Sequence, residues 1–176
     1  MINFLYITYL QSGTAKQAEA YHVLTEHGVL EKLSAYAPIL VGTIPINIDI
    51  ESSDLDIICY AKDEEEFKKD LNHYFSKEKG FSISENAQLR AIKANFFIDG
   101  FELEIFGQNR PTQEQNAYRH LLIEYKLLLE KGDKFRQEVI DLKKQGYKTE
   151  PAFAKLLNMT GNPYEALLKF GETDFS

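Results

Sequence analysis

Two aspartates open the stretch that decides the fold, residues 52–60: Ser52-Ser53-Asp54-Leu55-Asp56-Ile57-Ile58-Cys59-Tyr60. The apolar residues from Leu55 onward predict a buried central strand. Because side chains alternate along a strand, Asp54 and Asp56 are expected to point the same way. Two adjacent carboxylates in apolar surroundings lose hydration and repel each other, so a positive group must offset them. A divalent metal ion is the obvious candidate.

A Gly-Thr step lies upstream of this stretch, at the end of another apolar run. Residues 38–41 form an apolar run that ends at the Gly42-Thr43 step, and residues 39–42 read as a short strand. Glycine lets the backbone come close to a ligand, and backbone N–H groups and the Thr43 hydroxyl can donate to anions. The step therefore predicts a cradle for phosphate groups beside the aspartates.

A β-hairpin centred on Asp99-Gly100 is expected to supply a third carboxylate. An Asp-Gly step between the runs 91–98 and 101–106 indicates a two-residue loop. Glu104 then lies deeper in the hairpin than Glu102, which lies beside the turn. Glu104 is the preferred third acid, and the choice between the two stays open. One face of the hairpin also carries two candidates for substrate contacts, Lys93 and Asn95.

Helices are predicted around these strands. Thr14 and Gln17 form a capping box that opens one helix. Thr112 and Gln115 are interpreted as a second capping box, after which apolar residues recur at helical spacing until Gly132 interrupts them. The fold class is therefore α+β. A small mixed β-sheet core with flanking helices is expected over residues 1–108, with a helical part, residues 109–176, packed on it.

One further pair of polar residues lies on the first helix of the helical part. His120 and Glu124 are four residues apart and share a helical face. They could line a cleft between the two parts of the chain, with Gln108 and Tyr118. The simpler interpretation is a hydrogen bond on the helix surface.

Composition narrows the classes of partner. The formal net charge is −7, and phosphate contacts normally supply most of the affinity for nucleic acid, so a long nucleic acid is not expected. A single cysteine, Cys59, excludes an internal disulfide. No stretch approaches the roughly 20 apolar residues that span a bilayer. No membrane partner is expected, and the cytoplasm is the expected location.

These motifs together resemble a known family. Gly42-Thr43, ten intervening residues and then Asp54-x-Asp56 in an apolar strand resemble the signature of the nucleotidyltransferase superfamily, the DNA polymerase beta-like fold. The segments around Gly42, Asp54, Glu104 and residues 148–154 are similar to an uncharacterised bacterial domain family assigned to that fold. The chain departs from the superfamily pattern at Thr43, where serine is usual, and at Glu104, where aspartate is commoner. It also lacks arginines or glycines after the Gly-Thr step.

The resemblance implies a Mg²⁺- or Mn²⁺-dependent enzyme that transfers a nucleoside monophosphate from a nucleoside triphosphate to an acceptor, here a small molecule or a protein. Asp54, Asp56 and Glu104 would bind metal and carry the catalysis. Phosphates would lie at Gly42 and Thr43.

Two alternatives stand beside this hypothesis. The first is a non-catalytic nucleotide-sensing or antitoxin-like module on the same fold, for which the isoleucine-rich segment 44–50 would form a protein contact. The second is a glycosyltransferase that uses sugar nucleotides, since these enzymes also hold metal with Asp-x-Asp. The short chain and the Gly-Thr step argue against the second.

Overall fold

A mixed five-stranded sheet, in the order β1-β2-β5-β4-β3, forms the centre of the computed structural model, which describes residues 2–174. β2 and β5 are parallel, and each of the other neighbouring pairs is antiparallel. The strands are β1 (Ile39–Val41), β2 (Leu55–Tyr60), β3 (Lys79–Asn86), β4 (Ala91–Ile98) and β5 (Phe101–Gln108). The expected α+β class, with a small mixed sheet and flanking helices, is confirmed.

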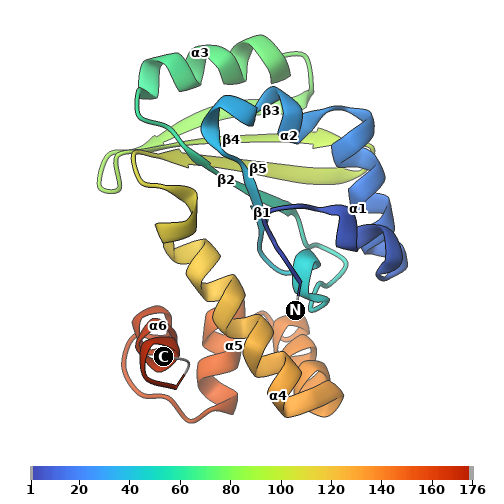
Figure 1. The fold of residues 1–176 in the computed structure, drawn as a ribbon, viewed down its shortest axis with the longest axis vertical. Helices are drawn as coiled ribbons and strands as arrows, with labels where there is room; N and C mark the ends of the chain where they lie inside the picture. Colours follow the sequence, from blue (N-terminus) through green and yellow to red (C-terminus); the bar gives the residue numbers. More distant parts are fainter. Residues whose placement is uncertain (1, 175–176) are drawn as a thin grey trace.

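The helices lie on opposite sides of the sheet, which separates the two groups in Figure 1. On one face, Leu55, Ile57 and Cys59 of β2 join a buried core with the first three helices. On the other face, Ile58 and Val41 join a core with the last three helices. The helices are α1 (Ala15–Glu26), α2 (Val29–Lys32), α3 (Glu64–Phe75), α4 (Asn116–Lys144), α5 (Thr149–Leu156) and α6 (Pro163–Asp174).

The hairpin between β4 and β5 has the predicted register. Asp99 and Gly100 both adopt positive φ, as a tight two-residue hairpin loop requires. Asn95 pairs with Glu104, and Phe97 pairs with Glu102. Because β5 is also parallel to β2, the same register places Glu104 directly beside Asp56 on the neighbouring strand.

The two predicted capping boxes have different outcomes. The first is confirmed, since the Thr14 and Gln17 side chains and backbone groups bond reciprocally at the start of α1. The second is wrong, because residues 112–114 form a 3₁₀ turn and Gln115 caps α4 without a side-chain bond to it. The Gln115 amide instead donates to the carbonyls of Cys59 and Arg110, each at 2.9 Å. This tertiary contact ties the start of α4 to the end of β2.

Gly132 interrupts α4, as the sequence predicted, and forms a non-helical kink between two helical arms. Its φ of 76° and ψ of −171° lie in a region that side chains with a Cβ rarely enter. After the bend, the second half of α4 turns back toward the loop between β1 and β2. Between Gln108 and residue 174 the chain forms only helices and loops. The helical part also packs against the start of the chain, where the Phe4 ring meets Tyr125 edge-on at 5.0 Å.

No helix within residues 2–174 combines the length and apolar character needed to cross a membrane.

Candidate active site

A cleft of about 700 Å³ separates the ends of β1, β2 and β5 from the helices α4 and α5. We call its two sides the strand wall and the helical wall. Charged side chains line both of them. The acids are Asp54, Asp56, Glu104, Glu124 and Glu150, and the lysine and arginine residues are Arg110, Lys143 and Lys148.

Asp56 lies at the centre of the strand wall. It pairs with Val41 of β1 on one side and with Glu104 of β5 on the other. Burial raises its pKa to about 7, and the negative charges of Asp54 and Glu104 add to the shift, while Lys143 opposes it. Asp54 and Glu104 are therefore close enough to Asp56 for their charges to repel its carboxylate.

Gly42 is required by the position of the Asp56 carboxylate. A Cβ on Gly42 would lie only 2.2 Å from Asp56 Oδ2, and the φ of Gly42 is +80°. The missing side chain thus makes room for a carboxylate of the protein itself, in addition to any ligand. Thr43 beside it donates its hydroxyl to Ser53 Oγ at 3.2 Å, and Ser53 Oγ also accepts from the Ile50 amide at 2.9 Å.

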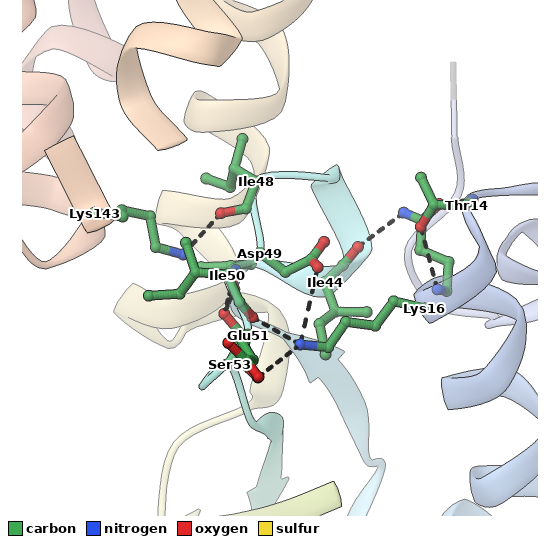
Figure 2. A network of polar contacts seen from close by, with 11 residues as sticks. Thr14, Lys16, Ile44, Ile48, Asp49, Ile50, Glu51, Ser53 and Lys143 are labelled. Atoms are coloured by element: carbon green, nitrogen blue, oxygen red, sulfur yellow. Dashed lines mark hydrogen bonds and ion pairs between the residues drawn. The ribbon is translucent and has the colours of Figure 1, made fainter. Parts of the chain in front are cut away.

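The loop of residues 44–51, which joins this Gly-Thr step to Asp54, is held from one side by α1 (Figure 2). Lys16 Nζ donates to the carbonyl of Ile50 at 2.7 Å and to that of Glu51 at 3.2 Å. Gln17 Nε2 donates to the Ile44 carbonyl at 2.8 Å. The loop contains a 3₁₀ turn, Ile44–Ile46, next to these contacts.

The same loop is held from the opposite side by the second half of α4. Lys143 Nζ donates to the Ile48 carbonyl at 2.8 Å (Figure 2). Arg136 donates to the carbonyls of Ile46 and Asn47. Loop carbonyls that would otherwise be unsatisfied are thus bonded by side chains from two helices, which fixes the position of Thr43 and Asp54.

Glu104 contacts a lysine in addition to its acidic neighbours. Lys93 Nζ donates to Glu104 Oε2 at 2.8 Å, and this bond raises the pKa of Lys93. Lys93 and Asn95 lie outside the cleft lining, and the Asn95 amide reaches Glu102 at 3.4 Å. Glu102 also lies outside the lining, whereas Glu104 is part of it. Within residues 2–174, no group of three or more His, Cys, Asp and Glu has an arrangement ready to hold a metal ion.

Lys143 stands between the two walls. Burial lowers its pKa to about 8, although Asp49, Glu124 and Asp56 act in the opposite direction. Sequence reasoning had assigned this lysine only to the end of a helix. Lys143 reaches the site only because the chain turns at Gly132, and the local sequence does not predict the direction of that turn.

The helical wall brings His120 and Glu150 together. His120 Nε2 donates to the Tyr164 carbonyl at 3.0 Å, which leaves Nδ1 facing Glu150 Oε1 at 3.4 Å. Burial alone would raise the pKa of Glu150, but the contact with His120 outweighs it and the pKa lies below its usual range. The polar residues at the start of α5, Lys148, Thr149 and Glu150, line the cleft.

Glu124 and Gln115 are the cleft residues that each carry a buried side-chain oxygen without a hydrogen-bond partner in the described part of the chain. The exposed fraction of Glu124 is 4%, and its oxygen without a partner is Oε1. Burial raises the pKa of Glu124 well above the usual range, and Glu150 adds to this. His120 and Glu124 therefore both lie in the cleft, and neither makes the helix-surface hydrogen bond that was the simpler interpretation.

Several solved structures are similar in fold to this chain. The polymerase core of TRAMP, a RNA surveillance complex, aligns with a TM-score of 0.55 and 12% identity over 95% of this chain and 53% of that one. The Cid1 poly(U) polymerase with Mg 3'-dATP bound aligns with a TM-score of 0.54 and 15% identity over 92% and 52%. The GLD-2/RNP-8 complex aligns with a TM-score of 0.51 and 15% identity over 94% of this chain and 64% of that one.

At these identities the comparison establishes the fold, the polymerase beta-like nucleotidyltransferase fold that the motifs indicated. The chain spans about half the length of the first two structures. Nothing in these comparisons supports the alternative of a non-catalytic module. No curated protein sequence matches the chain. A family model described as Domain of unknown function (DUF4269) matches residues 22–170, which include both walls of the cleft.

Proposed function

The chain belongs to the DUF4269 family, and we propose that it is a nucleotidyltransferase, dependent on Mg²⁺ or Mn²⁺, that moves a nucleoside monophosphate from a nucleoside triphosphate to a small-molecule or protein acceptor. One observation carries this proposal. Asp56 is half-buried between Gly42 and Glu104, and its pKa rises to about 7 because burial removes its hydration and the charges of Asp54 and Glu104 add to the shift. A cation bound at this point would stabilise the folded protein, because it would offset the repulsion between the carboxylates.

The donor set suits a hard divalent cation. Mg²⁺ prefers one or two carboxylates together with phosphate oxygens and water. Asp54 and Asp56 are the proposed ligands, and Glu104 is the proposed third acid once its bond to Lys93 gives way. The bound ion would neutralise charge on the phosphate oxygens during transfer.

The triphosphate side of the site is proposed to use two basic residues, Lys143 of α4 and Arg110, which follows β5. The loop 44–51 lacks the arginines or glycines that often follow the Gly-Ser step of the superfamily, but Lys143 reaches this loop from α4. Lys143 and Arg110 both line the cleft and can neutralise phosphates. The Thr43 hydroxyl, oriented by Ser53, is a further donor.

In the proposed reaction, an acceptor hydroxyl oxygen forms a bond to the α-phosphorus. The bond from that phosphorus to the bridging oxygen breaks, and pyrophosphate leaves with the electron pair. The hydroxyl proton passes to a carboxylate of the cleft, for which Glu104 is our candidate. The protein would hold both reactants in line and keep the carboxylates in position to bind the metal ion and accept the proton.

A small or protein acceptor is favoured over a long nucleic acid. The chain carries a net charge of −7, and five acids face three lysine and arginine side chains in the cleft. Such a lining repels a polyanion unless many cations intervene. The matched polymerases extend well beyond the region that this chain covers.

The test is a thermal-shift panel of the four ribonucleoside triphosphates, each with Mg²⁺, Mn²⁺ or EDTA. Metal-dependent stabilisation by at least one nucleotide is expected, since a ligand that binds the native state raises its melting temperature. Asp56→Asn should abolish the effect. Glu102→Gln is the matched control, because Glu102 lies on the neighbouring strand β5 and outside the cleft. If no nucleotide stabilises the protein and Asp56→Asn behaves as wild type, the proposal is wrong.

A further inference from the structure

Glu124 carries a buried carboxyl oxygen with nothing to bond. Oε1 has no partner within residues 2–174, although the residue is 4% exposed and lines the cleft. Unsatisfied buried acceptors are rare in native proteins, and those that persist commonly mark a place where a ligand completes the hydrogen bonds. The question is which group could do so.

The neighbouring donors are already engaged. Lys143 Nζ donates to the Ile48 carbonyl at 2.8 Å and faces the acids of the strand wall. His120 uses Nε2 for the Tyr164 carbonyl and turns Nδ1 to Glu150. Within the described residues, neither Lys143 nor His120 is hydrogen-bonded to Glu124 Oε1.

We infer that Glu124, with Glu150 beside it, forms the acceptor subsite of the cleft and binds a protonated amino group of a small hydroxylated acceptor. This inference rests on the proposed function, because it assigns the substrate class for the same cleft. An ammonium group offers several N–H donors and a positive charge. It would satisfy Oε1 and reduce the repulsion between Glu124 and Glu150 that burial intensifies.

The layout of the cleft supports a cationic acceptor over a neutral or anionic one. Five carboxylates line the cleft against three lysine and arginine side chains, Arg110, Lys143 and Lys148. The metal and the triphosphate occupy the strand wall in the proposed function. An acceptor held at Glu124 approaches from the opposite wall, so its hydroxyl can face the α-phosphorus across the cleft. An anionic acceptor would meet Glu124 and Glu150 directly.

The experiment uses three probes with one ring and different charge: glucosamine, glucose and glucuronate. Binding to the full chain, with and without Mg²⁺ and the nucleotide that stabilises it best, is measured by calorimetry. Transfer of label from the α-phosphate is measured in parallel. Glucosamine should bind more tightly than glucose, and glucuronate should bind least. Glu124→Gln should weaken glucosamine binding by about tenfold or more, which corresponds to one charge-assisted bond.

Glu130→Gln is the matched control, since Glu130 is exposed on the same helix. A second variant, Glu150→Gln, tests the subsite if Glu124→Gln folds poorly, and it should also reduce the preference for glucosamine over glucose. The inference is overturned if glucosamine and glucose bind equally, or if both variants keep the wild-type preference for glucosamine. In either case water alone would satisfy Glu124 Oε1. Nucleotide binding reports separately on the proposed function. Amine binding without any nucleotide effect would uphold the subsite and refute nucleotidyl transfer.

Discussion

The two walls of the cleft differ in how completely their polar groups are satisfied before any ligand arrives. On the strand wall, the loop 44–51 has its carbonyls bonded by Lys16 and Lys143, and Glu104 is bonded to Lys93. On the helical wall, Glu124 Oε1 stays without a partner in the described chain. The difference indicates that one wall is preorganised for a fixed task, whereas the other is completed by what it binds.

Substitution of Gly42 should produce the largest effect, because it disturbs the strand wall at its tightest point. In Gly42→Ala, the new Cβ would lie 2.2 Å from Asp56 Oδ2, so the carboxylate must move. Nucleotidyl transfer should fall by about 10²-fold, as expected when a reacting geometry is displaced by roughly 1 Å. Stability should fall by roughly 1–2 kcal/mol from the positive φ alone. Activity assays and denaturant unfolding measure the two losses.

Gly100→Ala is the control for Gly42→Ala. Gly100 has a similar φ of +87° but no atom within 4 Å of the added Cβ. It should share the loss of stability and keep its activity. If both variants lose activity equally, the contact between Gly42 and Asp56 is not what matters.

The pH dependence of the metal-free protein should reveal the repulsion on the strand wall. The pKa of Asp56 is about 7 in the folded state and near 3.8 when unfolded, so the folded state binds more protons between these values. Stability contributed by protonated Asp56 is therefore complete below pH 4 and is lost as the pH rises through 7. In EDTA, wild type should lose roughly 5–10 °C in melting temperature relative to Asp56→Asn across this range.

Mg²⁺ at pH 7.5 should restore part of that loss in wild type and none in Asp56→Asn. Parallel melting curves of the two proteins across the whole range would instead mean that Asp56 is not the titrating group. Glu124 also has a raised pKa, but it is present in both proteins and cancels in the difference.

Replacing Glu124 by leucine should separate stability from function on the helical wall. Glu124→Leu removes an unsatisfied buried carboxyl, so the protein should become more stable by about 1–2 kcal/mol. Binding of an amine should be lost at the same time. Urea unfolding measures the first effect, and a loss of stability would show that Glu124 already has a structural partner.

The smallest effect is expected at Ser53, a positioning residue of the strand wall. Ser53→Ala removes the acceptor for Thr43 Oγ1 and for the Ile50 amide. Each such bond contributes about 1 kcal/mol. The KM for the nucleotide should rise a few-fold with kcat nearly unchanged, because Thr43 loses its orientation but not its hydroxyl. A fall in kcat alone would argue for a direct role of Ser53.

Local patterns predicted the strand wall well. The two-residue loop at Asp99-Gly100 fixes the hairpin register, and that register places Glu104 where a carboxylate was sought. Strand β3 was not predicted because most of its residues are exposed at the edge of the sheet, and only alternate positions such as Ile83 reach the core.

The helical wall was harder to predict because it depends on contacts between distant segments. Gln115 has the spacing of a capping residue, but its amide bonds to Cys59 across 56 positions instead. Lys143 meets Ile48 only because α4 turns back at Gly132. The spacing of His120 and Glu124 indicated a shared helical face, but not the burial that leaves Glu124 unsatisfied.

The two arms of α4, joined at the kink at Gly132, thus lie on two sides of the cleft. The first arm carries Glu124, and the second arm carries Lys143 to the loop that orients Thr43 and Asp54. The angle at Gly132 therefore sets the distance between the nucleotide and the acceptor molecule. A Cβ built on Gly132 would have no atom within 4 Å. A change in this one angle would widen or narrow the cleft for acceptors of different size without replacing any of the reacting residues.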